Sequence, residues 1–225
     1  MSTPEKVTFP SRAYKLAGLF YPPVAGSPDR AGASIAGFTC LTYDAAYQGE
    51  SEGEPRDLED PYQRVEDIKC AVTYLVGRKE VDSNKIGVLG ICASGGYAPF
   101  AAQTDLRIKA VATSAAVCVG TMARRGFDKD SSNREILKTQ LEAAGKDRNS
   151  DLGGEKIPAV HMLPEKPEDA PAEMPESFRD LMSYYRTPRA FHPRATNTTL
   201  ARGWDIMANF DAFAHNYLIS PRPCL

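Results

Sequence analysis

The sequence lacks the features of a membrane protein, a zinc protein or a disulfide-stabilised protein. No apolar run is long enough to span a bilayer, and the first six residues carry no apolar secretory core. The five cysteines include no C-x-x-C pair, so neither a zinc site nor a disulfide framework is indicated. They are Cys40, Cys70, Cys92, Cys118 and Cys224. We expect no bound metal and a reducing compartment, which favours the cytoplasm.

The chain also lacks an excess of charge and any internal repeat. Its 27 Lys and Arg residues nearly balance its 29 Asp and Glu residues, giving a net charge of -2. This balance gives no electrostatic argument for nucleic acid or a membrane surface as partner. The length of 225 residues suits one domain. The C-terminal Pro-Cys-Leu shares only its last residue with a peroxisomal Ser-Lys-Leu address, so the peroxisome is the alternative location.

Residues 86–97 form the stretch on which the functional prediction depends. A short apolar segment, 86–91, leads through small residues into 98–102, which can form a helix. A strand, a tight turn and a helix around one reactive side chain form the pattern of a nucleophile elbow, which needs small residues at Gly90 and Ser94. The pattern places Cys92 at the nucleophile position. There, the helix dipole and free N–H groups favour a thiolate.

Cys92 also has other interpretations. A free cysteine is often a small buried apolar residue without a chemical role. Ser94 is a second candidate nucleophile, although it follows the strand too late for the elbow register. A dinucleotide-type phosphate loop is disfavoured, because residues 90–95 lack the middle glycine and no acidic residue follows at a strand end about twenty residues later. We therefore expect no cofactor.

The order of apolar and polar segments predicts an α/β fold. Residues 5–9 and 14–21 alternate and favour an edge hairpin. Residues 31–36 suit a short helix, and the apolar run 38–44 suits a buried strand. A helical pattern begins at residue 63 with Asp60 as its N-cap before Pro61, and residues 108–114 suit another strand. Helices between such strands predict a mostly parallel sheet with right-handed crossovers.

The composition changes after residue 118. The following residues are charged, rich in proline and weakly periodic, with amphipathic pieces at 134–141 and 178–182 and a closing run at 209–214. Such an insertion after a central strand is typical of a helical lid over an active site. An ordinary surface excursion or a partly disordered linker is the alternative. Aromatic residues within 184–193 could line a pocket or anchor a loop. We divide the chain into a core (1–118), a lid (119–215) and a return to the core (216–225).

Six segments carry a resemblance to a known family. They are residues 5–10, 43–53, 64–68, the elbow, 184–189 and 220–223. With them the chain resembles the α/β-hydrolases, in the dienelactone-hydrolase-like branch that carries cysteine at the elbow. More narrowly, it is similar to the fungal polyketide-transferase family typified by the fumagillin-pathway transferase, whose relatives occur in gene clusters for host-selective toxins. Bacterial hydrolases of unknown substrate share the same segments.

The resemblance implies acyl transfer or the hydrolysis of esters and thioesters. In the family, a thiolate attacks a carbonyl, a histidine relays the proton and an acidic residue orients the histidine. The nucleophile corresponds to Cys92, and the backbone N–H of Ala93 corresponds to half of the oxyanion hole. The implied partner is an acyl or polyketide small molecule, free or bound to a carrier as a thioester.

The sequence departs from the family pattern in two places. Relatives have a further strand and a His-Pro-Gly-Gly-like loop, which supplies the other oxyanion donor, where this chain has only residues 22–37. Relatives also continue past the segment 220–223 to the catalytic acid and histidine, whereas this sequence stops at residue 225. We therefore expect a fold truncated at the C-terminus, with an incomplete catalytic triad.

Few side chains remain that could replace the absent triad partners. The three histidines, His161, His192 and His215, each suit a structural or surface role. Asp44 and Glu50 are expected near the C-terminal edge of the sheet, where sites occur, but they suit solvated loop carboxylates.

Two hypotheses follow from the sequence. In the first, the protein performs acyl transfer or (thio)ester hydrolysis in fungal secondary metabolism, with Cys92 as nucleophile and a polyketide or toxin precursor as substrate. In the second, it is a shortened and catalytically inactive paralogue that acts as a binding partner or has no function, because loss of both triad partners removes most of the catalytic rate.

Overall fold

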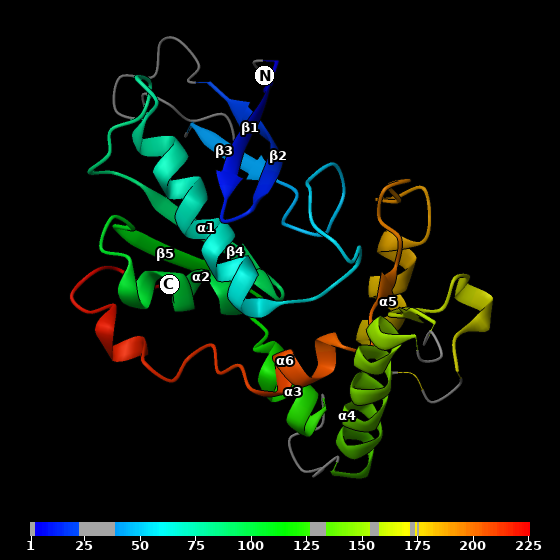
Figure 1. Ribbon diagram of the computed structural model, residues 1–225. Coiled ribbons are helices and arrows are strands. Elements are labelled where there is room, and N and C mark those ends of the chain that lie inside the picture. The colour runs from blue at the N-terminus through cyan, green and yellow to red at the C-terminus, as the bar shows by residue number, and fades with distance from the viewer. Residues whose placement is uncertain (1–2, 23–38, 127–133, 154–157, 172–173, 175) are drawn as a thin grey trace.

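The structure is a computed structural model that describes residues 3–22, 39–126, 134–153, 158–171, 174 and 176–225 (Figure 1). Its strands are β1 (Glu5–Ser11), β2 (Tyr14–Tyr21), β3 (Cys40–Tyr43), β4 (Gly87–Ile91), β5 (Ala110–Ser114), β6 (Val160–His161) and β7 (Thr198–Thr199). Its α-helices are α1 (Pro61–Val76), α2 (Ser94–Thr104), α3 (Val119–Arg125), α4 (Arg134–Asn149), α5 (Glu176–Tyr185) and α6 (Gly203–Ala208). The 3₁₀ helices are η1 (Ser150–Leu152), η2 (Pro167–Asp169) and η3 (Asn216–Leu218). This mixture of helices and strands confirms the α/β class.

The N-terminal strands form an antiparallel sheet in the order β1-β2-β3. The expected hairpin is confirmed, and Arg12 adopts a left-handed φ of 49° in its tight turn. The run 38–44 does form a strand, β3, but this strand is half-buried, with Thr42 exposed. The expectation of a buried strand is wrong because β3 pairs on one side only, with β2, in the part of the chain that the structure describes.

The parallel pairing expected of the sheet is found between β4 and β5, in register from Gly87 opposite Ala110 to Ile91 opposite Ser114. The C-terminal residues run along the other edge of β5. The Val111 N–H donates to the Pro223 carbonyl over 3.0 Å, and the Leu225 N–H donates to the Val111 carbonyl over 3.0 Å. Among the described residues β3 does not pair with β4, so the antiparallel and parallel strands form separate sheets.

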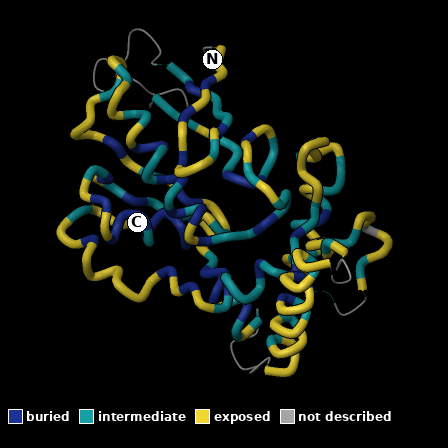
Figure 2. The backbone as a smooth tube through the Cα atoms, viewed as in Figure 1, coloured by how far each residue is buried: buried dark blue, intermediate teal, exposed yellow. Residues whose placement is uncertain are grey.

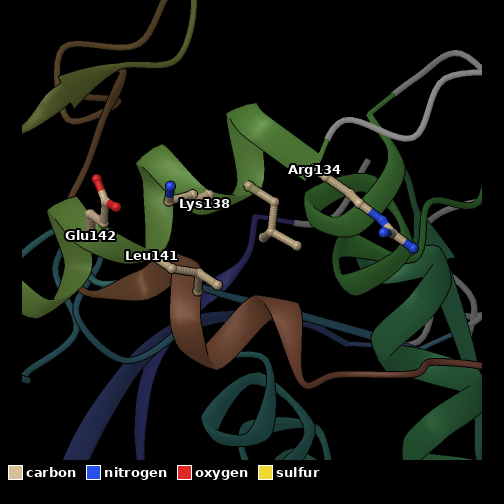
Figure 3. A pocket seen from close by; sticks show the side chains of 5 residues that line it. Arg134, Lys138, Leu141 and Glu142 are labelled. Atoms are coloured by element: carbon tan, nitrogen blue, oxygen red, sulfur yellow. The ribbon is translucent and has the colours of Figure 1, made fainter.

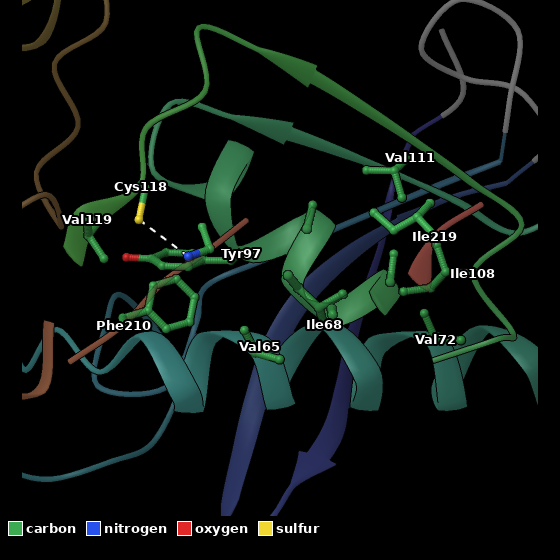
Figure 4. Close-up of a cluster of buried hydrophobic side chains, with 14 of the residues drawn as sticks. Val65, Ile68, Val72, Tyr97, Ile108, Val111, Cys118, Val119, Phe210 and Ile219 are labelled. Carbon is green, nitrogen blue, oxygen red and sulfur yellow. Dashed lines mark hydrogen bonds between the residues drawn. The ribbon is translucent and has the colours of Figure 1, made fainter. Parts of the chain in front are cut away.

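Helix α1 begins where the sequence predicts. The Asp60 side chain accepts hydrogen bonds from the N–H groups of Tyr62 and Gln63, and Pro61 occupies the first turn, where no backbone donor is needed. Figure 4 shows Val65, Ile68 and Val72 pointing from α1 into the main core. This face packs α1 against α2 beside the parallel strands.

The segment after residue 118 contributes directly to this core. Phe210 is 0% exposed, and its ring lies 4.7 Å from that of Phe100, 5.5 Å from that of Tyr62 and 5.8 Å from that of Tyr97. Val119 of α3 joins the same cluster. The base of the expected lid and the α/β core therefore share one hydrophobic interior.

The amphipathic pieces 134–141 and 178–182 lie in α4 and α5, as expected. Figure 1 shows α4 standing out from the body, and Figure 2 shows most of its length exposed. The run 209–214 is not helical, because α6 ends at Ala208 and the following residues turn to insert Phe210 into the core. The short helix expected at 31–36 lies outside the described residues.

No helix in the described ranges combines the length and apolar character that a membrane span requires.

Replacing Phe210 should show that the segment after α6 is part of the core. Phe210→Ala leaves a cavity among three rings, so we expect the free energy of unfolding to fall by about 3–5 kcal/mol in urea denaturation. The control, Phe213→Ala, removes a ring that is 39% exposed and should cost less than about 0.5 kcal/mol. Similar losses in both variants would contradict the packing.

Candidate active site

The backbone at Cys92 has the geometry of a nucleophile elbow. Cys92 follows β4 directly and is separated from α2 by Ala93 alone. Its φ of 57° is left-handed, which is uncommon for a residue with a side chain. Its N–H donates to the Ser114 carbonyl over 3.0 Å, and its carbonyl accepts the N–H groups of Gly95 at 2.9 Å and Val117 at 3.0 Å. These bonds hold the turn from both sides and leave the Cys92 side chain exposed.

Three glycines make this turn possible. A Cβ at Gly90 would clash with the Ser94 carbonyl and lie 2.9 Å from the Gly95 Cα. A Cβ at Gly95 would lie 2.6 Å from the Ala116 Cα, and one at Gly96 would lie 2.6 Å from the Val117 carbonyl oxygen. The end of β4, the start of α2 and the loop after β5 therefore approach too closely for any larger residue.

The Ala93 backbone is placed as the oxyanion interpretation requires. Ala93 is the N-cap of α2, and its N–H donates to no acceptor in the described part of the protein. A free N–H beside an exposed thiol can stabilise a developing oxyanion. Ser94 is exposed on the first turn of α2, beyond the left-handed residue, so the elbow register belongs to Cys92. The segment 22–37, where relatives carry the second donor, lies outside the described residues apart from Pro22.

The described contacts bring no histidine to Cys92. The His161 Nδ1 lies 2.8 Å from Glu165 Oε1, and the His192 Nδ1 accepts the Arg194 N–H over 3.2 Å. His215 is exposed and packs edge-on against Tyr217. Each imidazole thus has the surface or structural surroundings expected from the sequence.

Asp44 and Glu50 shape the loop after β3 and the contact of this loop with the segment after α5. The Asp44 carboxylate accepts the Glu50 N–H over 2.8 Å, and Glu50 forms an ion pair with Arg194 at 3.1 Å. Asp57 strengthens the same contact, because its carboxylate accepts the hydroxyl groups of Thr196 at 2.8 Å and Thr198 at 2.7 Å. Asp44 and Glu50, which the sequence analysis interprets as loop carboxylates, therefore make structural contacts in and beside that loop.

Tyr185, at the end of α5, lies within electrostatic range of Cys92. Burial raises the pKa of the Tyr185 phenol, and the nearby Cys92 and Tyr184 raise it further. The rings of Tyr184 and Tyr185 pack edge-on at 5.0 Å, and the Arg189 guanidinium lies 5.6 Å from the Tyr184 ring centre. The aromatic segment noted in the sequence thus lies near the elbow, although sequence spacing alone does not identify Tyr185.

A hydrogen-bonded cluster of Tyr97, Glu59 and Arg64, which the sequence analysis did not predict, connects α2 to the start of α1. Tyr97 donates to Glu59 Oε1 over 2.6 Å, and Arg64 donates to the same carboxylate at 3.2 and 2.7 Å. Burial alone would raise the pKa of Glu59, but the charge and hydrogen bonds of Arg64 and the Tyr97 hydroxyl hold it below its ordinary value. The cluster joins α1 to the helix that follows Cys92.

Cys118 is a second thiol in this region, and its contacts are structural. It is 7% exposed, and its sulfur accepts the N–H groups of Thr121 and Ala212, each over 3.4 Å. Burial alone would raise the pKa of this thiol, but these hydrogen bonds lower it below its ordinary value. Figure 4 shows the sulfur beside the ring of Tyr97, inside the core.

No family model matches the sequence. The uncharacterised protein YcjY of Escherichia coli strain K12 is 40% identical over 187 residues, which are 82% of this chain and 60% of the relative. The protein PA2218 of Pseudomonas aeruginosa is 34% identical over 194 residues and is covered for 50% of its length. The chain therefore spans between half and three fifths of these curated relatives.

The solved structures extend the likeness over the whole chain. The crystal structure of PA2218 covers 100% of this chain and 77% of its own, with a TM-score of 0.86 and 28% identity. The crystal structure of the α/β-hydrolase GrgF from a Penicillium species covers 99% of this chain and 78% of its own, with a TM-score of 0.77. This chain has the α/β-hydrolase fold. The likeness to GrgF shows the fold alone, because the aligned structures are 23% identical.

Part of this chain also matches, in sequence, a fungal protein whose name states a function. The polyketide transferase grgF is 34% identical over 120 residues, which are 53% of this chain and 37% of the relative. The resemblance to fungal polyketide transferases inferred from the motifs therefore holds at modest identity.

Gly90 should be the least replaceable glycine near the site. A Cβ in Gly90→Ala would force apart β4 and α2, so we expect a loss of about 1–3 kcal/mol in the free energy of unfolding. The control is Gly145→Ala in α4, where a Cβ meets nothing within 4 Å. Because alanine is the better helix former, it should stabilise the protein by about 0.5–1 kcal/mol. Thermal and urea denaturation measure both, and a neutral Gly90→Ala would contradict the elbow geometry.

The Glu59 cluster predicts a pH-dependent difference in stability. Because the folded-state pKa lies below its ordinary value of 4.5, the ionised carboxylate stabilises the fold above that pH and loses this effect as the pH falls through the folded-state pKa. Glu59→Gln should therefore lower the free energy of unfolding at neutral pH by about 1–3 kcal/mol. The gap to the unsubstituted protein should shrink in acid.

Urea denaturation across this pH range measures the gap. The control, Glu135→Gln, removes an exposed carboxylate and should track the unsubstituted protein throughout. A Glu59→Gln deficit that stays constant or grows below pH 4.5 would show that the carboxylate charge contributes nothing.

Proposed function

We propose that the chain performs acyl transfer or (thio)ester hydrolysis, with Cys92 as nucleophile, in the formation of a polyketide-type metabolite. The observation that supports the proposal is the left-handed, exposed cysteine between β4 and α2. Among curated relatives, a polyketide transferase shares part of the sequence. The dienelactone-hydrolase-like branch, the toxin pathway and a carrier-bound substrate remain predictions from the motifs.

The first step forms a covalent intermediate. The Cys92 thiolate attacks the acyl carbonyl carbon, a C–S bond forms, and the carbonyl electron pair moves onto oxygen. The Ala93 N–H donates to this oxygen. The tetrahedral intermediate collapses with loss of a thiolate or alkoxide, which takes up a proton from water. A hydroxyl group of an acceptor, or water, then attacks the thioester carbonyl carbon, the C–S bond breaks to release the Cys92 thiolate, and the proton of the attacking hydroxyl passes to the hydroxide left in the solvent by the first step.

The acyl group would lie between the elbow and the aromatic residues at the end of α5. Tyr184 and Tyr185 are 44% and 46% exposed, so their rings can contact a bound molecule. Phe191 is 52% exposed and lies 5.7 Å from the Arg186 guanidinium. Half-exposed aromatic rings beside arginines suit a flat, conjugated acyl chain.

The positions of the histidines favour a second candidate function, which is binding of an acyl compound without turnover. In the described contacts, His161 pairs with Glu165, His192 accepts the Arg194 backbone N–H and His215 packs against Tyr217, so none of the three contacts the thiol. A thiolate without a relay can still accept an acyl group, but it then releases it slowly. Steady-state hydrolysis of an acyl thioester, measured beside an active relative, separates the two functions.

Alkylation kinetics test the nucleophile assignment. We expect iodoacetamide to modify Cys92 at least about tenfold faster than Cys224, because the elbow presents the Cys92 sulfur to solvent beside the backbone N–H groups at the start of α2. Cys224 is the matched control, since both residues are exposed while Cys118 is buried. Peptide mapping by mass spectrometry at timed intervals gives both rates.

Equal rates at Cys92 and Cys224 would mean that exposure alone explains the reactivity, and the nucleophile role would be wrong. In Cys92→Ser the rate at Cys224 should be unchanged. A change there would indicate that the substitution had disturbed the sheet, because Pro223 and Leu225 pair with β5.

A further inference from the structure

Helix α4 carries an apolar face that the rest of the described chain does not cover. Ala144 and Asp147, on its inner face, are 0% and 5% exposed and pack toward α6. Next to this inner face, a groove of about 390 Å³ follows the N-terminal half of the helix (Figure 3). The groove is lined by Arg134, Leu137, Lys138, Leu141 and Glu142.

The spacing of the lining residues defines one continuous stripe. Their offsets along the helix are 0, 3, 4, 7 and 8, which place them on one face of an α-helix. Leu137 and Leu141 form the apolar seam, and Leu141 is 39% exposed. In the described residues the ion pairs of α4 are made by Asp147 and Arg148 at its other end, so the charges of the stripe are available.

We propose that this face binds the same face of a second copy of the chain, in an antiparallel and two-fold symmetric contact between two α4 helices. The charge order along the stripe selects this partner. Arg134 and Lys138 are at its start and Glu142 is at its end, so reversing the direction of one helix brings opposite charges together. A parallel pair would instead place like charges level with each other.

The leucines set the register of the contact. In this register Leu137 lies opposite Leu141 of the partner subunit. The numbers of any two residues that lie level with each other therefore add up to 278. Glu142 of the partner subunit is then level with residue 136. It lies two residues, or about 3 Å along the axis, from both Arg134 and Lys138. These three residues lie on one side of the leucine seam, and in an antiparallel pair equivalent sides face each other.

The symmetry doubles every contact. Four leucines form the seam, and each Glu142 faces two cations, so the attraction occurs twice in the dimer. A single helix pair buries less surface than the roughly 1,600 Å² of a typical stable complex. The equilibrium should therefore lie in the micromolar range and weaken with salt, because the ion pairs are exposed.

Sedimentation equilibrium of the full chain over a wide concentration range tests the contact. The unsubstituted protein should form dimers reversibly. Glu142→Arg places a third cation against two others and should weaken the dimer at least about tenfold. The control, Glu176→Arg, makes the same charge change on exposed α5 and should leave the dissociation constant unchanged.

A charge exchange shows whether the pairing is the one proposed. The triple variant Arg134→Glu, Lys138→Glu and Glu142→Arg restores opposite charges in the antiparallel register, so it should regain much of the affinity that Glu142→Arg loses. Far-UV circular dichroism confirms that each variant is folded. A protein that is monomeric throughout, a dimer insensitive to Glu142→Arg, or a triple variant that is not rescued would each overturn the proposal.

Discussion

The left-handed backbone at Cys92 is the constraint on which the site depends. A residue with a side chain occupies this conformation only where its surroundings enforce it. Here the enforcement comes from hydrogen bonds at both Cys92 backbone groups and from glycines that allow β4, α2 and the loop after β5 to meet. The same geometry directs the thiol outward, next to the Ala93 N–H, which donates to no acceptor among the described residues. Exposure of the sulfur and closeness of the backbone donor thus have a single cause.

The rest of the molecule keeps this turn in place from two directions. On one side, α1 and α2 pack through a shared core, and the Glu59 cluster ties the first turn of α2 to the start of α1. On the other side, Phe210 returns to the core and fixes the base of the segment that carries α5. Glu50 and Asp57 bind the residues after α5 to the loop after β3. The aromatic end of α5 is therefore held near the elbow by contacts at both ends of its segment.

Local patterns in the sequence predicted the features that local forces determine. The cap at Asp60, the hairpin, the elbow and the helical pieces around residues 134–141 and 178–182 depend on neighbours along the chain, and each is present. The α/β-hydrolase fold followed from motifs that keep their order. The periodicity of one segment does not specify its pairing partner, so the antiparallel, one-sided pairing of β3 could not be predicted.

Contacts between residues far apart along the chain also could not be predicted from the sequence. Tyr97 and Glu59 are separated by 38 positions, and nothing in either segment marks the carboxylate as a partner of the phenol. Phe210 lies in the run predicted to close the insertion, yet packing against Phe100 and Tyr62 makes it the most enclosed ring of its segment. The nearness of Tyr185 to Cys92 likewise arises from the fold of the whole segment between them.

The most direct test of the account is to look for an acyl group on Cys92. The full chain would be mixed with a short-chain acyl thioester, quenched in acid at timed intervals and analysed by intact-mass and peptide mass spectrometry. The account predicts an added acyl mass that forms within a single turnover, maps to the peptide containing Cys92 and is absent from Cys92→Ala. No adduct, or an adduct distributed equally over Cys92, Cys40 and Cys224, would contradict it.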